Sequence, residues 1–252
     1  MGTDKDWEQW GAADPYFGVL SSDEFRKDRL DARAKDEFFA SGRRHIERVF
    51  QLISENFGHA FFPNTALDFG CGVGRLVLTL AERTERTVGI DISPSMIAEA
   101  LDNTKYAGIT NVSFVLSDDA LTNVVGEFSF VHSCIVLQHI PWARGRLILQ
   151  QLADRVEPGG YLAVHFLTSS SAPKLIRAAV RLRYVFPPLN WLRNLTKRRP
   201  LFEPAMQLHI YNTGKIILDL KERNFETPVC CNEPDMDGFT SILLLARRLP
   251  KP

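Results

Sequence analysis

The sequence of 252 residues has no excess of either charge, few cysteines and no long apolar run. Its 30 lysines and arginines balance 30 aspartates and glutamates, whereas general binding of nucleic acid needs a basic surface. No apolar stretch approaches the roughly 18–20 residues that cross a bilayer, and the polar, acidic start of the chain does not resemble a secretion signal. We therefore expect a soluble cytoplasmic protein without a nucleic-acid partner.

The cysteines are too few and too irregularly spaced for the common metal and redox motifs. Cys71, Cys134 and the neighbours Cys230 and Cys231 form no C-x-x-C pair. Neighbouring residues of a strand point to opposite faces, so Cys230 and Cys231 are not expected to hold one metal ion together. Carboxylates and histidines also lack the clustering that metal-assisted catalysis needs. We expect reduced thiols and no metal.

Short apolar runs alternate with longer segments of helical spacing through most of the chain. The length fits one large domain, and this alternation predicts a parallel sheet covered by helices on both faces. Residues 1–29, rich in acids and aromatics, are expected to form an irregular arm with one short helix. Strands are predicted at 66–69, 87–92, 112–116, 128–135, 161–166, 227–231 and 239–246, and helices at 30–56, 74–83, 94–106, 141–156 and 212–223.

The alternation breaks between residues 169 and 200. Residues 171–200 carry eight bases and no acid, although the whole chain is neutral. Pro187 and Pro188 divide this segment, which predicts two short amphipathic helices. The excess of bases, together with Phe186, Trp191 and Leu192, suits a lid over a bound ligand or a weak contact of residues 173–199 with an anionic membrane. The remaining alternative is a solvated basic surface that only pads the fold.

A glycine loop follows the first predicted strand. It reads Asp68-Phe69-Gly70-Cys71-Gly72-Val73-Gly74-Arg75, and the third glycine of the dinucleotide pattern G-x-G-x-x-G would fall at Arg75. Asp68 would repel a pyrophosphate but suits an ammonium group. Asp91 follows Gly70 by 21 residues, at the end of the next strand, where an acid accepts both ribose hydroxyls. A nucleoside that carries an amino-acid group fits all three features, and S-adenosylmethionine is such a ligand.

The sequence resembles the class I S-adenosylmethionine-dependent methyltransferases over about residues 40–167. The resemblance implies an α/β, Rossmann-like sheet of seven strands, six parallel and the last antiparallel, with helices on both faces. It also implies a transferase of class EC 2.1.1 whose cofactor is S-adenosylmethionine. The matching stretches are LDFGCGVGR at 67–75, VGIDISPSM at 88–96, VLSDD at 115–119, FSFVHSCIVLQHIP at 128–141 and VEPGGYL at 156–162.

The resemblance implies roles for two groups of residues. At the nucleoside end, Asp91 takes the ribose hydroxyls and Ile92 and Met96 pack on adenine, while Asp118, or Asp119 after a slip of one residue, accepts from the adenine amino group. At the methionine end, Asp68 lies near the ammonium and Arg43 near the carboxylate. Gly70, Cys71, Gly72 and Gly74 form the floor, and Ser133 and Leu137 flank the sulfonium.

His139 is the candidate catalytic base. It follows the fourth strand of the core, whose carboxyl end faces the ligand crevice in an open α/β sheet. A base is needed when the acceptor is a poor nucleophile such as an alcohol. Tyr16, His165, His209 and Tyr211 are further candidates for contact with the acceptor.

The most favoured function is methylation of a hydroxyl on a small molecule, namely a natural product, a sugar or a lipid-linked compound. Residues 133–136 read Ser-Cys-Ile-Val where nucleic-acid amino-methylating enzymes carry N/D-P-P-Y/F, which disfavours base methylation. An N-methyltransferase for a small amine and a non-catalytic S-adenosylmethionine-binding protein remain alternatives. Asp68 and Arg75 disfavour a nicotinamide-dependent oxidoreductase.

The expected organisation is one domain in four segments. Residues 1–57 form an arm and a helix that cap the cofactor site, and 58–168 form the cofactor-binding core. Residues 169–211 are expected to be a lid over the acceptor pocket. Residues 212–252 supply the last helix and the closing strand hairpin.

Overall fold

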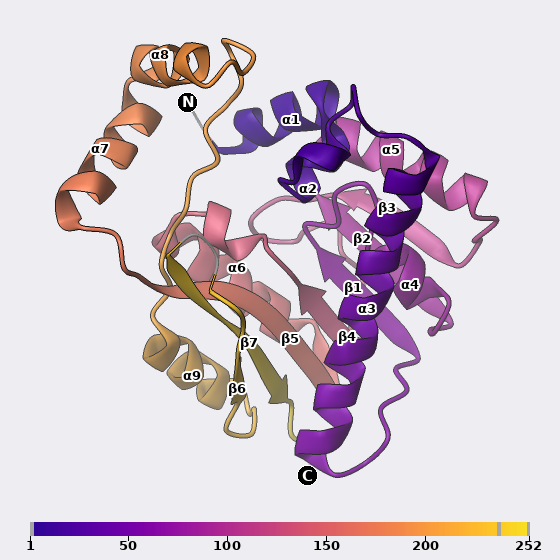
Figure 1. Cartoon of the computed structure of the whole chain (residues 1–252). Coiled ribbons are helices and arrows are strands. Elements are labelled where there is room, and N and C mark those ends of the chain that lie inside the picture. The colour runs from indigo at the N-terminus through magenta and orange to yellow at the C-terminus, as the bar shows by residue number, and fades with distance from the viewer. Residues whose placement is uncertain (1–2, 236–237, 251–252) are drawn as a thin grey trace.

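The computed structural model describes residues 3–235 and 238–250, and its centre is one seven-stranded sheet (Figure 1). The strands lie in the order β3-β2-β1-β4-β5-β7-β6. β7 is antiparallel to both of its neighbours, so the other six strands run in one direction, which confirms the predicted fold class. The strands are β1 (Thr65–Phe69), β2 (Arg86–Asp91), β3 (Val112–Leu116), β4 (Phe128–Ser133), β5 (Val156–Ser170), β6 (Val229–Asn232) and β7 (Phe239–Arg247).

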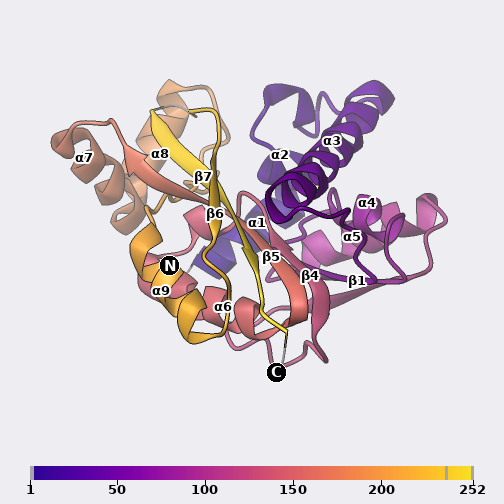
Figure 2. The same ribbon diagram turned by 90° about the horizontal axis from the view of Figure 1, so that it is seen from below.

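Helices cover both faces of the sheet, because alternate strand residues point to opposite sides. Leu67 of β1 joins a core cluster with α6 and α9, whereas its neighbour Ala66 joins one with α3 and α4. Figure 2 shows α3 and α6 on opposite sides of the sheet. The covering helices are α3 (Ala32–Phe57), α4 (Val77–Ala81), α5 (Pro94–Tyr106), α6 (Trp142–Asp154) and α9 (Thr213–Glu222).

The N-terminal segment is more regular than predicted. It forms α1 (Thr3–Ala13), α2 (Pro15–Val19) and a 3-10 turn at Asp23–Phe25, so the expectation of an irregular arm with one short helix was wrong. Tertiary packing accounts for the difference, because Trp10, Phe17 and Phe25 are buried in one cluster with Phe38 and Met96. This packing holds α1 beside α5 at the carboxyl end of the parallel strands (Figure 1).

The basic segment after β5 forms two helices, as predicted. These are α7 (Lys174–Val185) and α8 (Pro187–Thr196), which project from one corner of the fold in both views (Figures 1 and 2). The chain then returns to the sheet, where the amide of Tyr211 donates to the Leu167 carbonyl over 2.8 Å. None of the described helices is long and apolar enough to cross a membrane.

Candidate active site

The glycine loop between β1 and α4 takes a conformation that side chains would not allow. Gly70 and Gly72 have φ angles of +72° and +52°, in the left-handed region that favours glycine. A Cβ atom at Gly70 would collide with Val136, and one at Gly72 would collide with Val19. The loop backbone therefore lies close to α2 and to the segment that follows β4. Both glycines line a cavity.

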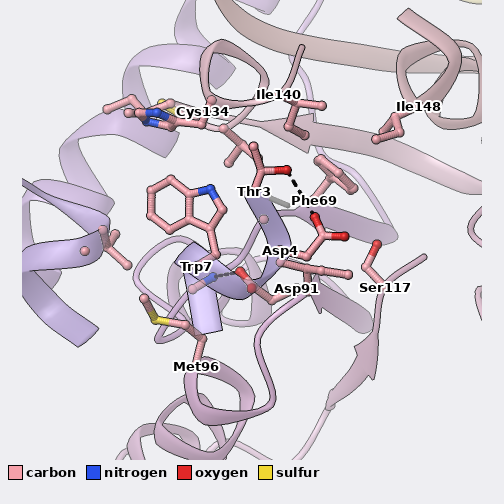
Figure 3. Close-up of a pocket in the computed structure, with 18 of the residues that line it drawn as sticks. Thr3, Asp4, Trp7, Phe69, Asp91, Met96, Ser117, Cys134, Ile140 and Ile148 are labelled. Carbon is pink, nitrogen blue, oxygen red and sulfur yellow. Dashed lines mark hydrogen bonds between the residues drawn. The ribbon is translucent and has the colours of Figure 1, made fainter. Parts of the chain in front are cut away.

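That cavity lies at the carboxyl ends of β1, β2 and β4 and has a volume of about 800 Å³, open mouth included, which is usual for a small-molecule site. Figure 3 shows the indole of Trp7 reaching into it from α1, with Asp91 and Met96 on one side and Cys134 on the other. The lining residues are Thr3, Asp4, Trp7, Gly18, Val19, Phe69, Gly70, Gly72, Asp91, Ile92, Met96, Ser117, Asp119, Cys134, Ile135, Val136, His139, Ile140, Arg144 and Ile148.

Asp91 is fixed at the end of β2 by backbone donors. Its Oδ2 accepts from the Gly72 amide over 2.8 Å, and its Oδ1 accepts from the Ser93 amide over 2.9 Å. Burial raises the pKa of Asp91 to about 6, although these hydrogen bonds favour the ionised form. Each oxygen retains a lone pair, so the carboxylate is able to accept two further hydrogen bonds.

The other end of the cavity joins apolar walls to an ion-pair network. Asp119 lines the cavity, whereas the neighbouring Asp118 turns back to accept from the Thr122 amide over 2.9 Å. Arg144 pairs with Asp119 at 2.7 Å and with Asp4 at 2.6 Å. The structure thus brings the second of the two predicted aspartates to the cavity. Apolar side chains of Phe69, Ile92, Met96, Ile140 and Ile148 line it as well.

The charge of the cavity favours a cationic ligand. Of the described lining residues, Asp4, Asp91 and Asp119 are acids, and Arg144 is the one strong base. Because Arg144 is already paired with Asp4 and Asp119, it offers little charge to a phosphate. A pyrophosphate is therefore disfavoured, and a ligand with an ammonium or sulfonium group is favoured.

Most of the predicted methionine-end residues do not line the cavity. Asp68 is buried, and its Oδ1 lies 2.8 Å from His132 Nδ1. Ser133 is also buried and donates its hydroxyl to the Phe69 carbonyl over 3.0 Å. Cys71 and Leu137 are buried, and Gly74 ends the loop with a φ of +86°. These residues support the shape of the loop and of the segment after β4 but do not line the cavity.

Arg43, predicted to lie near the cofactor carboxylate, does not line the cavity, and the buried arginine nearby is Arg75. Arg43 lies on an outer face of α3, half-exposed, with its guanidinium 3.7 Å from Glu82. Arg75 is buried beside Asp68 and Cys134, and the burial lowers its pKa. It donates to Ser41 Oγ over 3.2 Å. The buried cation next to the cavity wall is thus Arg75. The only feature of the sequence that singles it out is its position directly after the last glycine of the loop.

His139 is held in one orientation on a 3-10 turn at Leu137–His139. Its Nδ1 lies 2.8 Å from the Gln207 carbonyl oxygen, so this nitrogen carries the hydrogen and Nε2 presents a lone pair. Gln138 Nε2 is 3.5 Å from His139 Nε2. Burial lowers the pKa of His139 to about 4, so the imidazole is neutral at neutral pH. The Trp7 ring meets it edge to face at 4.9 Å.

The other predicted acceptor contacts are placed elsewhere: within the described part of the chain, none of the four lines the cavity. The Tyr16 hydroxyl bonds to Glu99 and Asn103 of α5, and the Tyr211 hydroxyl donates to the Ile140 carbonyl. His165 is buried on β5. His209 is half-buried, 3.3 Å from the Gln207 side-chain oxygen.

The N-terminal helix α1 is one element whose contribution to the site sequence reasoning missed. Thr3, Asp4 and Trp7 line the cavity, and Glu8 fixes α1 to the start of α5. Glu8 accepts 2.6 Å hydrogen bonds from the hydroxyls of Ser93 and Ser95. The available signal was the spacing of Trp7 and Trp10, three residues apart as on one helix face. Across the described residues, no group of three or more His, Cys, Asp or Glu is arranged to hold a metal ion.

Comparison with known proteins agrees with this geometry. Residues 66–160, which contain the glycine loop, Asp91 and His139, match the family model described as a methyltransferase domain. Residues 66–160 therefore form a methyltransferase domain, within the fold of the class I S-adenosylmethionine-dependent methyltransferases. This confirms the predicted family and cofactor, and residues 66–160 hold most of the cavity wall outside α1 and α2.

The curated relatives of this methyltransferase match it over part of their length. Methyltransferase GfsG of Streptomyces halstedii is 29% identical over 136 residues, which are 53% of this chain and 47% of the relative. The ribosomal protein L11 methyltransferase of Burkholderia mallei is 32% identical over 123 residues, which are 48% of this chain and 37% of the relative. The chain thus spans less than half the length of these two relatives.

Solved structures share the fold over nearly the whole chain. Magnesium protoporphyrin IX methyltransferase from Synechocystis, with bound S-adenosylmethionine, has a TM-score of 0.59 at 20% identity and covers 98% of both chains. The N-methyltransferase NodS from Bradyrhizobium japonicum has a TM-score of 0.56 at 17% identity, covering 96% of this chain and 98% of its own. At these identities the likeness establishes the architecture alone.

Proposed function

We propose that the protein transfers the methyl group of S-adenosylmethionine to a hydroxyl of a small molecule, such as a natural product, a sugar or a lipid-linked compound. The observation that carries this proposal is the orientation of His139. Its Nδ1–H is fixed on the Gln207 carbonyl, and its ring borders both the cofactor cavity and a smaller hollow beyond it. A neutral imidazole at this junction suits removal of a hydroxyl proton.

The cavity fits the cofactor in charge and shape. Asp91 is set to accept from the two ribose hydroxyls, and Gly70 and Gly72 present bare backbone to the cavity where the chain that joins the sugar to the methionine would pass. Ile92 and Met96 offer an apolar wall for adenine. The buried Arg75 is the proposed partner of the carboxylate, in place of Arg43. When bound, the cofactor supplies a methyl group on a sulfonium, which is a good leaving group.

The chain itself has to align the acceptor and receive its proton. Methyl transfer is a direct displacement, so alignment of the nucleophile supplies much of the acceleration. His139 Nε2 would take the proton of the acceptor hydroxyl as its oxygen receives the methyl group, which bound S-adenosylmethionine would supply, leaving as S-adenosylhomocysteine. Because the pKa of His139 is about 4, this base does not ionise an alcohol in advance. Proton transfer therefore accompanies methyl transfer.

The test is the variant His139→Asn, which keeps an N–H group for the Gln207 carbonyl but removes the base. We expect turnover to fall by roughly 10²–10⁴-fold with nearly unchanged cofactor affinity. With S-adenosylmethionine at saturation, the wild-type pH–rate profile should have an acidic limb near pH 4, and the variant should lack it. The matched control is the exposed His59→Asn, which should keep full activity. Wild-type turnover in His139→Asn would contradict the base and favour a small-amine acceptor, and cofactor binding without transfer to any acceptor would favour a non-catalytic binding protein.

A further inference from the structure

A line of hollows leads from His139 to the two helices α7 and α8. Trp7 and His139 line the cofactor cavity and also the smaller hollow beyond it, which Gln207 lines too. Asp6 and Gln207 then line both this hollow and a larger pocket against α7 and α8. We call this larger space the hairpin pocket, and its volume is about 470 Å³ with its mouth included. The three spaces adjoin one another, with His139 at the first junction.

The hairpin pocket combines aromatic faces with planar polar groups. Trp191 of α8 is 37% exposed, and Phe202 meets its ring edge to face at 5.4 Å. Aromatic rings beside solvent offer an apolar face to the C–H side of a sugar ring. Carboxylate, amide and guanidinium groups form paired hydrogen bonds with neighbouring hydroxyls, because their donors and acceptors lie in one plane. The residues with such groups that line the pocket are Asp6, Gln9, Arg183, Asn190, Glu203 and Gln207.

Two of these polar side chains have unused hydrogen-bonding atoms. Arg183 Nε and Asn190 Oδ1 are buried and have no partner within the described residues. One is a donor and the other an acceptor, and leaving either without a partner costs free energy. A phosphate or carboxylate ion satisfies donors alone and is repelled by the carboxylate of Asp6. A hydroxyl both donates and accepts, so a polyhydroxyl ligand matches the set.

We propose that the hairpin pocket binds a sugar ring of the acceptor, so that the methylated hydroxyl belongs to a glycoside or an oligosaccharide. This inference rests on the proposed function, because the pocket is assigned to the substrate of the His139 reaction. The two helices α7 and α8 then supply contacts to the acceptor. Trp191 is the residue on which the sugar ring stacks, and Arg183 is a donor to its hydroxyls.

The experiment is saturation-transfer NMR with methyl glycosides of several hexoses as probes, and with inorganic phosphate in competition. We expect transfer to the ring protons of at least one glycoside with the wild-type protein. Trp191→Ala and Arg183→Met should each weaken that binding about tenfold or more. The matched control is Leu192→Ala, next to Trp191, 60% exposed and outside the pocket, which should bind like the wild type. Circular dichroism checks that each variant is folded.

Calorimetry with S-adenosylmethionine separates this inference from the proposed function. Cofactor binding without a signal from any glycoside would overturn the sugar site and leave the methyltransferase proposal standing. Displacement of the glycoside by inorganic phosphate would also overturn it, in favour of an anion site. Loss of glycoside binding in Leu192→Ala as much as in Trp191→Ala would contradict the stacking role. A protein that fails to bind the cofactor would overturn the proposed function, and the acceptor assignment with it.

Discussion

His132 Nδ1 lies 2.8 Å from Asp68 Oδ1, and both side chains are buried at the carboxyl end of the sheet. A carboxylate only accepts, so His132 Nδ1 carries the hydrogen, and in the neutral imidazole its Nε2 accepts from His45 Nε2 at 3.0 Å. That leaves His45 Nδ1 as an acceptor 3.9 Å from Cys134 Sγ. In the row Cys134, His45, His132 and Asp68, each group therefore donates its hydrogen towards the Asp68 carboxylate.

The first prediction concerns His132→Leu, which leaves the buried Asp68 carboxylate without its partner. We expect the free energy of unfolding to fall by about 1.5–3 kcal/mol, the usual worth of a hydrogen bond to a charged group. Urea denaturation measures this change, and the exposed His59→Leu is the control. In a double-mutant cycle, Asp68→Asn should cost much less when His132 is already leucine. Additive losses would contradict the coupling.

The second prediction is that His165 makes a pH-dependent contribution to the free energy of unfolding. Burial lowers the pKa of His165 to about 4, below its value of 6.5 in the unfolded chain. The unfolded state therefore binds more protons between these values, and the stability contributed by neutral His165 is lost as the pH falls from 6.5 towards 4. Each pH unit in this window costs up to about 1.4 kcal/mol.

Replacement of His165 by leucine should remove this share. The unfolding free energy of His165→Leu should fall less steeply than that of the wild type between pH 6.5 and 4, whereas His59→Leu should follow the wild type. Thermal unfolding in buffers across this range measures the difference. Parallel curves for His165→Leu and wild type would show that His165 titrates alike in both states.

The third prediction links cofactor affinity to the ionisation of Asp91. The ionised carboxylate accepts from both ribose hydroxyls, and its pKa is raised by burial to about 6. The affinity for S-adenosylmethionine should therefore fall as the pH drops below 6 in the wild type. In Asp91→Asn it should be weaker by roughly 1.5–3 kcal/mol and nearly flat with pH. Calorimetry that finds unchanged affinity in the variant would refute the ribose assignment.

Features of the fold and of the site that depend on residues close together in the sequence could be predicted. The glycine loop and Asp91 each lie at a strand end, and the parallel direction of the core strands follows from the alternation of elements. The choice between Asp118 and Asp119 was not, because Arg144 of α6 takes the second aspartate and Thr122 takes the first. Such choices depend on residues that meet only in the folded chain.

The role of α1 could not be predicted for the same reason, because its contacts join residues far apart in the sequence. Glu8 bonds to Ser93 and Ser95, some 85 positions along the chain, and no local pattern announces that contact. Likewise, the Gln207 carbonyl sets the tautomer of His139, although Gln207 lies in a segment without helix or strand. His139 was predictable by its place after β4, but the orientation of its ring was not.

The fourth prediction tests Glu8 as the latch of α1. Glu8→Ala removes the acceptor of both serine hydroxyls at the start of α5, so α1 and its Trp7 should leave the cavity more often. We expect several-fold faster dissociation of S-adenosylhomocysteine, in line with the loss of a helix-cap contact of about 1 kcal/mol. Stopped-flow tryptophan fluorescence measures the rate. Lys5→Ala, also on α1 but outside the cavity lining, is the control and should release the ligand at the wild-type rate.

The last prediction concerns the helices α7 and α8, which the sequence suggests are a lid or a membrane contact. Replacing residues 173–199 by a short glycine linker removes Trp191 and Arg183 but leaves the cavity residues in place. Cofactor binding should persist while methyl transfer is lost, because the acceptor no longer has its pocket. Full activity of the deletion variant would contradict both the lid and the sugar site.

Sedimentation with vesicles distinguishes the two uses of this basic segment. Phe186, Leu192 and Leu195 are exposed, as are the apolar side chains with which a helix enters a membrane surface, and the bases of the segment favour anionic lipid. The wild-type chain should stay in the supernatant with neutral phosphatidylcholine vesicles and with vesicles containing phosphatidylserine if the helices serve only the acceptor. Salt-sensitive sedimentation with phosphatidylserine vesicles, lost in the deletion variant, would instead assign them a membrane contact. Leu195→Glu should then abolish sedimentation without changing glycoside binding, because Leu195 lies outside the hairpin pocket.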